Sequence, residues 1–167
     1  MKKLNFLKAI VDWTFLMSCF SIPLLIFYTG LILIDNDPSE IGINISGTEI
    51  IAVDLQSKLL LVFLSISCLL IIYCLFLFRK TLRLFQKAKI FDLEVIKKFN
   101  TIGILLMISA LGSGIPAFIL KFINRKVGFE IGLNPYVMLF SLGLFFMVLS
   151  EVFTIAKKQK EENELTV

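Results

Sequence analysis

The chain has 167 residues, of which 57% are hydrophobic and 18% are charged, and its formal net charge is +4 at pH 7. Soluble domains are about 45–50% apolar and about 25% charged, so this composition excludes an ordinary soluble protein. The sequence contains no histidine, which excludes histidine-ligated metal sites and histidine general bases. A single membrane domain is the class that remains.

Uncharged stretches long enough to cross a bilayer occur four times along the chain. They are 20 to 22 residues long and cover residues 13–34, 59–78, 99–120 and 131–150. Crossing about 30 Å of hydrocarbon takes about 20 helical residues. We therefore predict an all-α, four-transmembrane-helix bundle within one domain, residues 1–167, with helices near residues 9–34, 59–85, 94–120 and 134–157. The first stretch exceeds the roughly 7–15 apolar residues of a signal peptide, so we expect it to be retained.

The basic residues predict the orientation of these helices. Thirteen of the 17 Lys and Arg residues lie in three segments, residues 1–12, 79–98 and 157–160. The other four are Lys58, Lys121, Arg125 and Lys126. We therefore expect the protein in the cytoplasmic membrane of the cell. The positive-inside rule places both termini and the inner loop, residues 86–93, on the cytoplasmic side. The net charge is explained by topology, so we expect no direct binding of nucleic acid.

The two outer loops are expected at residues 35–58 and 121–133. The first alternates apolar and polar residues around Ser46-Gly47-Thr48, which is compatible with a small extracytoplasmic β-hairpin. It is acidic, whereas the second carries Arg125 and Lys126. We expect the two loops to pack together as a cap, held mainly by apolar contacts because exposed ion pairs give only about 0–1 kcal/mol each.

Small residues recur in the third span at a spacing of four. Ser109 and Ser113 form one pair, and Ala110 and Gly114 form the other. Residues four apart share a face of a helix, and small side chains allow a second helix to approach closely. These four residues are the predicted helix-packing site.

Chemistry-bearing residues are few inside the spans. Asp12 and Glu151 are the carboxylates nearest the bilayer, and we expect nearby lysines such as Lys8 and Lys158 to neutralise them. An ion path usually shows ionisable residues near the middle of the membrane, and none lies there. We expect no enzyme activity, no cofactor and no metal site.

The C-terminal segment, residues 158–167, is predicted to be a cytoplasmic tail. Lysines at its start lie at headgroup level, and the acidic residues that follow repel an anionic membrane. The tip contains Leu165 and Val167, which either fray or dock by an extended contact on the 79–98 loop or on a partner.

Two stretches resemble a known family. The closing sequence EVFTIAKKQKEENELTV and the sequence KIFDLEVIKKFNTIGILL, with Phe91, Val95, Ile102 and Gly103, resemble the bacterial four-span membrane family catalogued as domain of unknown function 2975. The resemblance implies no catalytic activity and no cofactor. From the usual arrangement of such genes, it implies a small helix-turn-helix transcription factor as neighbour.

We therefore predict a regulatory or sensory membrane protein whose cytoplasmic face, residues 79–98 and 157–167, binds a soluble helix-turn-helix regulator. The acidic tail residues are expected to face basic residues of the 79–98 loop. The predicted partner-binding residues are Phe91, Val95, Glu161, Glu162, Glu164, Leu165 and Val167. Two alternatives remain open: a small accessory or structural protein that binds the bilayer and its own copies as a homo-oligomer, and a subunit of a transporter.

Overall fold

The computed structural model describes residues 2–34, 43–45, 48–50, 55–88, 90–123 and 134–164. Within them the order of elements is α1 (Lys2–Ile34), β1 (Ile43–Ile45), β2 (Thr48–Ile50), α2 (Leu55–Gln86), α3 (Leu93–Ile123) and α4 (Pro135–Glu164). All four helices are long and apolar enough to cross a membrane. The predicted all-α class with four membrane-spanning helices is confirmed.

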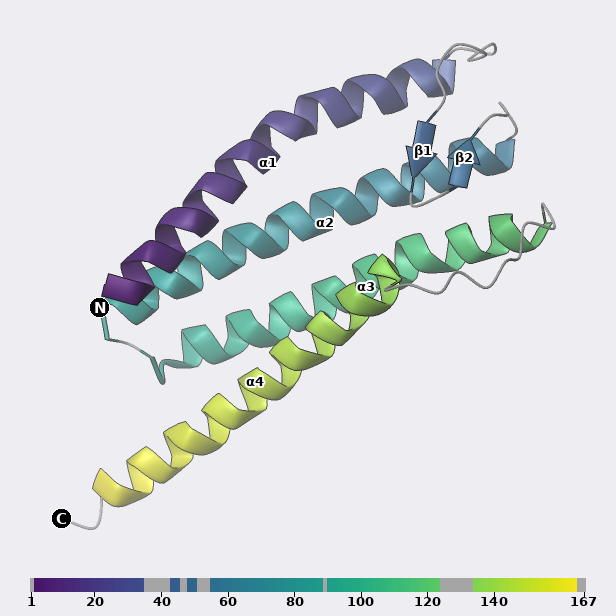
Figure 1. Cartoon of the computed structure of the whole chain (residues 1–167). Helices are drawn as coiled ribbons and strands as arrows, with labels where there is room; N and C mark the ends of the chain where they lie inside the picture. Colours follow the sequence, from purple (N-terminus) through teal and green to yellow (C-terminus); the bar gives the residue numbers. More distant parts are fainter. Residues whose placement is uncertain are drawn as a thin grey trace.

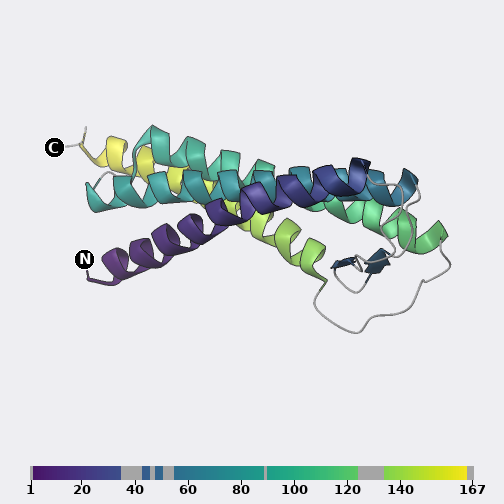
Figure 2. The same cartoon turned by 90° about the horizontal axis from the view of Figure 1, so that it is seen from above.

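The helices run antiparallel and pack in chain order (Figure 1). α1 packs on α2, α2 on α3 and α3 on α4. Figure 1 shows α1 and α4 at the two edges of this arrangement, with the α2–α3 pair between them. Both chain termini and the α2–α3 turn lie at one end, here called the termini end, and the β strands lie at the other, the hairpin end (Figures 1 and 2).

The two strands form the short hairpin that the alternating sequence suggested. β1 and β2 pair antiparallel, with Ile43 opposite Ile50, Asn44 opposite Glu49 and Ile45 opposite Thr48. The predicted cap between the two outer loops falls on residues 35–42, 51–54 and 124–133, which lie outside the described residues. The cap stays a prediction.

The helices extend beyond the predicted bounds. They contain 33, 32, 31 and 30 residues, whereas about 20 suffice to cross the hydrocarbon. α1 begins at Lys2, not near residue 9, and α4 ends at Glu164, not near residue 157. A charged residue marks where a helix leaves the hydrocarbon. The helix itself can continue beyond that residue, because Lys and Glu are good helix formers. Each helix therefore exceeds the membrane core by about 15 Å.

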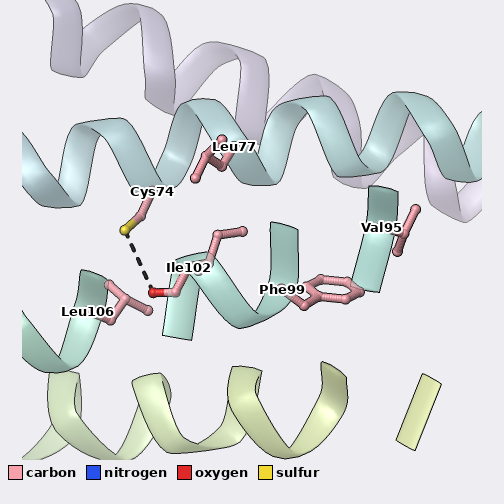
Figure 3. Packing of buried hydrophobic residues seen from close by; sticks show 6 residues of the cluster. All are labelled: Cys74, Leu77, Val95, Phe99, Ile102 and Leu106. Carbon is pink, nitrogen blue, oxygen red and sulfur yellow. Dashed lines mark hydrogen bonds between the residues drawn. The ribbon is translucent and has the colours of Figure 1, made fainter. Parts of the chain in front are cut away.

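The core of the protein lies where α2, α3 and α4 meet, toward the termini end. Its buried members, shown in Figure 3, are Cys74, Leu77, Val95, Phe99, Ile102 and Leu106. The Phe99 side chain is central, because its ring stacks on Phe146 and Phe153 of α4 with centroids 5.8 and 5.5 Å apart. Phe85 of α2 meets the same ring edge-on at 6.0 Å. Dispersion and aromatic contacts thus join three helices in a setting where lipid offers no hydrophobic driving force.

Side-chain hydrogen bonds also join α3 to its neighbours. Ser109 Oγ donates to the carbonyl of Ser67 on α2 at 3.0 Å, and Ser150 Oγ of α4 donates to the carbonyl of Ile96 at 2.8 Å. The Cys74 thiol is 3.8 Å from the carbonyl of Ile102 (Figure 3). All three donors are buried, so each bond satisfies a group that would otherwise be unpaired in a dry interface.

The α3–α4 contact depends on two facing glycines. A Cβ built on Gly103 would lie 2.7 Å from the carbonyl oxygen of Gly143, and one on Gly143 would lie 2.9 Å from that of Gly103. No real side chain fits at such distances, so both positions need glycine for the backbones to approach. Sequence reasoning did not single out Gly143.

The small-residue stripe predicted on α3 lies at helix interfaces in the structure. Ser109, Ala110 and Ser113 are buried, and a Cβ on Gly114 would lie 3.2 Å from Tyr136 Cβ on α4. The stripe serves two neighbours, because Ser109 reaches α2 while Gly114 faces α4.

α1 is attached to α2 by polar contacts near the termini end. Asp12 and Arg79 form an ion pair, and the Arg79 guanidinium lies 5.4 Å from the centroid of the Phe15 ring. Gln86 of α2 accepts a hydrogen bond from Lys8 Nζ at 2.8 Å. The expected neutralisation of Asp12 by Lys8 is therefore wrong, because a cation on the neighbouring helix reaches the carboxylate.

Candidate functional site

A polar cleft at the termini end is the candidate functional site. It forms where the α2–α3 turn meets the end of α4, and its volume is about 400 Å³. We call it the termini-end cleft, and it is lined by Ala88, Ile90, Phe91, Asp92, Lys157, Lys160, Glu161 and Glu164.

The cleft lies beyond the part of the protein that hydrocarbon can cover. The uncharged stretch of the last span ends at Ser150, and α4 continues for 14 more residues to Glu164. At 1.5 Å per residue these extend about 21 Å past the hydrocarbon, which exceeds the thickness of one headgroup layer. The cleft is therefore accessible from water.

The α2–α3 turn supplies one wall of the cleft. The N–H groups of Lys87 and Ala88 bond back to the carbonyls of Leu84 and Phe85, both at 3.1 Å, and close the last turn of α2. Ala88 then adopts a φ of 58°, the left-handed conformation that usually terminates a helix at glycine. A left-handed alanine is strained, and strained backbone is frequent at functional sites.

Asp92 begins α3 as its cap. Its Oδ1 accepts the N–H of Glu94 at 3.2 Å, and its carbonyl accepts the N–H of Val95 at 3.0 Å. This is the capping role that a residue of this type fills before a helix, because its side chain replaces a missing intrahelical partner. The cap holds the Asp92 carboxylate at the rim of the cleft.

The end of α4 supplies the opposite wall. Three lysines there form ion pairs with the glutamates one turn later: Lys157 with Glu161 at 3.5 Å, Lys158 with Glu162 at 3.9 Å and Lys160 with Glu164 at 3.6 Å. Each exposed pair stabilises the helix by only about 0.3–0.5 kcal/mol, but the three together favour continued helix. α4 was predicted to end near residue 157, but it continues through the predicted tail, residues 158–167, as far as Glu164.

The same pairs correct the expected contacts of the acidic residues. Glu161, Glu162 and Glu164 were expected to face basic residues of the 79–98 loop, but in the described part of the chain each forms an ion pair with a lysine of its own helix. A partner four residues away in a formed helix is already in place, whereas a contact across the cleft would require ordering two long side chains.

An aromatic contact forms the floor of the cleft. Phe91 is 37% exposed, and its ring centroid is 5.9 Å from that of Phe153 on α4. Phe153 in turn contacts Phe85 and Phe99 in the core. The floor is thus connected to the packed interior through Phe153.

The structure gathers three of the seven predicted partner-binding residues in this cleft: Phe91, Glu161 and Glu164. Val95 is fully buried in the core, so its assignment as a contact for a soluble partner is wrong. Glu162 is not among the residues that line the cleft, and Leu165 and Val167 lie outside the described residues.

Sequence reasoning missed the left-handed Ala88 and the cleft-facing lysines Lys157 and Lys160. The lysines were assigned to the headgroup layer alone. The helical spacing of 157, 160, 161 and 164 could have revealed a common face if the helix had been extended through the tail.

Two further pockets lie toward the hairpin end, on either side of α3. One, of about 370 Å³, lies between α2 and α3 beside Pro116, and the other, of about 400 Å³, lies between α3 and α4 beside Gly114. Both are mainly apolar, and they lie along helices that are long and apolar enough to cross a membrane. Lipid chains suit such surfaces, so they indicate no specific ligand.

Comparison with known proteins gives one result. No curated protein and no solved structure matches the chain. A family model does match, over residues 15–167, which include all of α2, α3 and α4 and the whole termini-end cleft. The chain belongs to the family described as protein of unknown function (DUF2975).

Proposed function

We propose that this membrane protein binds a soluble protein at its termini-end cleft. We also propose that it lies in the cytoplasmic membrane, with the termini end facing the cytoplasm. The proposed role is regulatory or sensory, and the protein acts by binding and not as an enzyme. The observation that carries the proposal is the cleft itself: a water-accessible hollow with an aromatic floor and a charged rim, built on rigid helices.

The composition of the cleft suits a protein partner. An exposed aromatic floor offers an anchoring contact, and aromatic residues are enriched where partners bind. The rim carries three carboxylates, on Asp92, Glu161 and Glu164, and two lysines. Such a rim favours a partner that presents an apolar side chain beside basic residues.

The class of the partner is inferred from the family. Genes of this family tend to lie beside genes for small helix-turn-helix transcription factors, and this arrangement supports such a regulator as the partner. A basic DNA-binding surface is complementary to the acidic side of the rim. Occupation of the cleft would then hold the regulator at the membrane and away from DNA.

Co-purification from native membranes tests the proposal. Glu161→Lys combined with Glu164→Lys reverses the acidic part of the rim. Glu94→Lys combined with Glu162→Lys is the matched control, because these exposed glutamates also pair with lysines but do not line the cleft. We expect wild type and control to enrich the same helix-turn-helix protein. The amount that co-purifies with the cleft variant should be at least tenfold lower.

The proposal fails if wild type retains no DNA-binding protein. It also fails if the cleft variant and the control retain equal amounts. Circular dichroism of all three purified proteins would show whether each remains helical, so that loss of binding is distinguished from loss of structure.

A further inference from the structure

Charge is unevenly divided between the two halves of the termini end. Among the described residues, α1, α2 and the residue that follows α2 contribute one acidic residue there, Asp12, and seven basic residues: Lys2, Lys3, Lys8, Arg79, Lys80, Arg83 and Lys87. The α3 and α4 half is balanced. It contributes Lys97, Lys98, Lys157, Lys158 and Lys160 against Asp92, Glu94, Glu151, Glu161, Glu162 and Glu164.

Ion pairing makes the contrast stronger. In the balanced half, Lys98, Lys157, Lys158 and Lys160 each pair with a glutamate on their own helix. In the other half, Arg79 of α2 pairs with the Asp12 carboxylate of α1. Within the described part of the chain, Lys80, Arg83 and Lys87 have no carboxylate partner.

Lys80 and Arg83 lie near the end of α2, and Lys87 directly follows its last residue, with its N–H still bonded to the Arg83 carbonyl at 3.3 Å. The three are spaced by three and four positions, so they lie on one face, and all three are exposed. We call Lys80, Arg83 and Lys87 the basic stripe. It extends about 10 Å along the helix axis.

The stripe begins at the depth of phospholipid headgroups. The uncharged part of α2 ends at Phe78, two residues before Lys80. The Lys80 ammonium lies 4.5 Å from the centroid of the Phe76 ring, so this cation is held by a cation–π contact at the edge of the apolar part of α2. Arg83 and Lys87 continue outward from that point.

We propose that the basic stripe is a binding site for the headgroup of an anionic phospholipid. Arg83 at its centre can contact a phosphate with two N–H groups, and the lysines on either side add point charges. The apolar surface of α2 below Lys80 accommodates the acyl chains. This inference goes beyond the proposed function and does not depend on it.

The position of the site gives it a structural consequence. Ala88 follows Lys87 directly and lines the termini-end cleft. A bound headgroup would hold the end of α2, from which the left-handed turn into α3 starts. The anionic lipid content of the membrane would therefore affect the order of that turn.

Lipid binding by the purified full chain in neutral detergent tests the inference. Affinity for a short-chain phosphatidylglycerol is compared with that for phosphatidylcholine of the same chain length, by native mass spectrometry. The stripe variant is Lys80→Gln, Arg83→Gln and Lys87→Gln together. Each basic residue near an anionic surface contributes about 1 kcal/mol, so loss of three lowers the affinity for phosphatidylglycerol about 100-fold.

The matched control removes the same charge from the balanced half, by Lys157→Gln, Lys158→Gln and Lys160→Gln together. These lysines are already paired with glutamates, so we expect a change of less than about fivefold. A second control, Lys80→Arg with Lys87→Arg, keeps the charge and should bind as wild type does.

Two results would overturn the inference: equal affinity of wild type for the two lipids, or equal losses in the stripe variant and the balanced-half control. If circular dichroism shows that the stripe variant is not helical, the lipid-binding measurement is repeated with Arg83→Gln alone. We expect that single change to weaken phosphatidylglycerol binding about fivefold, and unchanged binding would contradict the site.

Discussion

The crossing of α3 and α4 gives the most direct test of the packing. Substitution Gly103→Ala places a Cβ 2.7 Å from the backbone carbonyl oxygen of Gly143, whereas ordinary contact begins at 3.4 Å. The two helices must therefore separate by about 0.7 Å, because the obstacle is backbone and cannot rotate away. The Met147 Cγ atom, 2.6 Å from the same Cβ, can move more easily since its side chain is flexible.

The expected cost follows from two opposing terms. Overpacking of a tight interface costs about 1–3 kcal/mol, and the rigid obstacle places Gly103→Ala at the upper end. Alanine favours helix over glycine by about 1 kcal/mol in water. We therefore expect a net loss of about 2 kcal/mol in the free energy of unfolding. Reversible unfolding in mixed micelles, followed by circular dichroism, would measure it.

Two comparisons make this test specific. Gly30→Ala is the matched control, because a Cβ on Gly30 has nothing within 4 Å, and it should be neutral or stabilising. Gly143→Ala added to Gly103→Ala should cost less than the sum of the single changes, since the first has already separated the helices. If Gly103→Ala is as stable as Gly30→Ala, the glycine crossing is not a packing determinant and the reasoning is refuted.

Three further predictions concern the α2–α3 turn, the ion pair between α1 and α2, and the membrane topology. Ala88→Gly relieves the left-handed backbone and should raise the free energy of unfolding by about 1 kcal/mol, and a loss in the same assay would contradict the strained turn. Asp12→Asn and Arg79→Gln, measured singly and together, should show a coupling energy of about 1 kcal/mol that decreases in high salt; additive effects would mean that the ion pair does not join α1 to α2. In a cysteine-free background, Gln56→Cys should react with an impermeant thiol reagent from outside the cell and Lys158→Cys only after permeabilisation, whereas the reverse pattern would invert the topology.

The residues behind the family resemblance are mainly packing residues. Val95 and Ile102 are buried in the core, and Gly103 allows the contact between α3 and α4. Phe91 is different, because it is partly exposed and forms the floor of the termini-end cleft. A pattern dominated by such residues identifies the fold more directly than it identifies a ligand.

Hydrophobicity along the chain was sufficient to predict the number, order and approximate position of the membrane helices. This succeeds because hydrocarbon cannot satisfy backbone polar groups, so each crossing segment must be an uncharged helix of a minimum length. The same rule could not predict where the helices end. Outside hydrocarbon, helix persistence depends on local pairs such as Lys160 with Glu164, which extend α4 into the predicted tail.

Composition and spacing in this sequence thus determine that the chain is a four-helix membrane protein with a strongly basic end. Only the tertiary structure decides which residues meet there. Asp12 pairs with Arg79 and not with Lys8, Val95 points into the core, and Phe91 joins Glu161 and Glu164 around one cleft. The physical reason is that these contacts depend on the relative rotation and depth of helices distant in sequence. The rotation and depth of the helices are set by the close backbone approach at Gly103 and Gly143 and by the ring packing around Phe99. The order of residues along the chain does not specify these contacts.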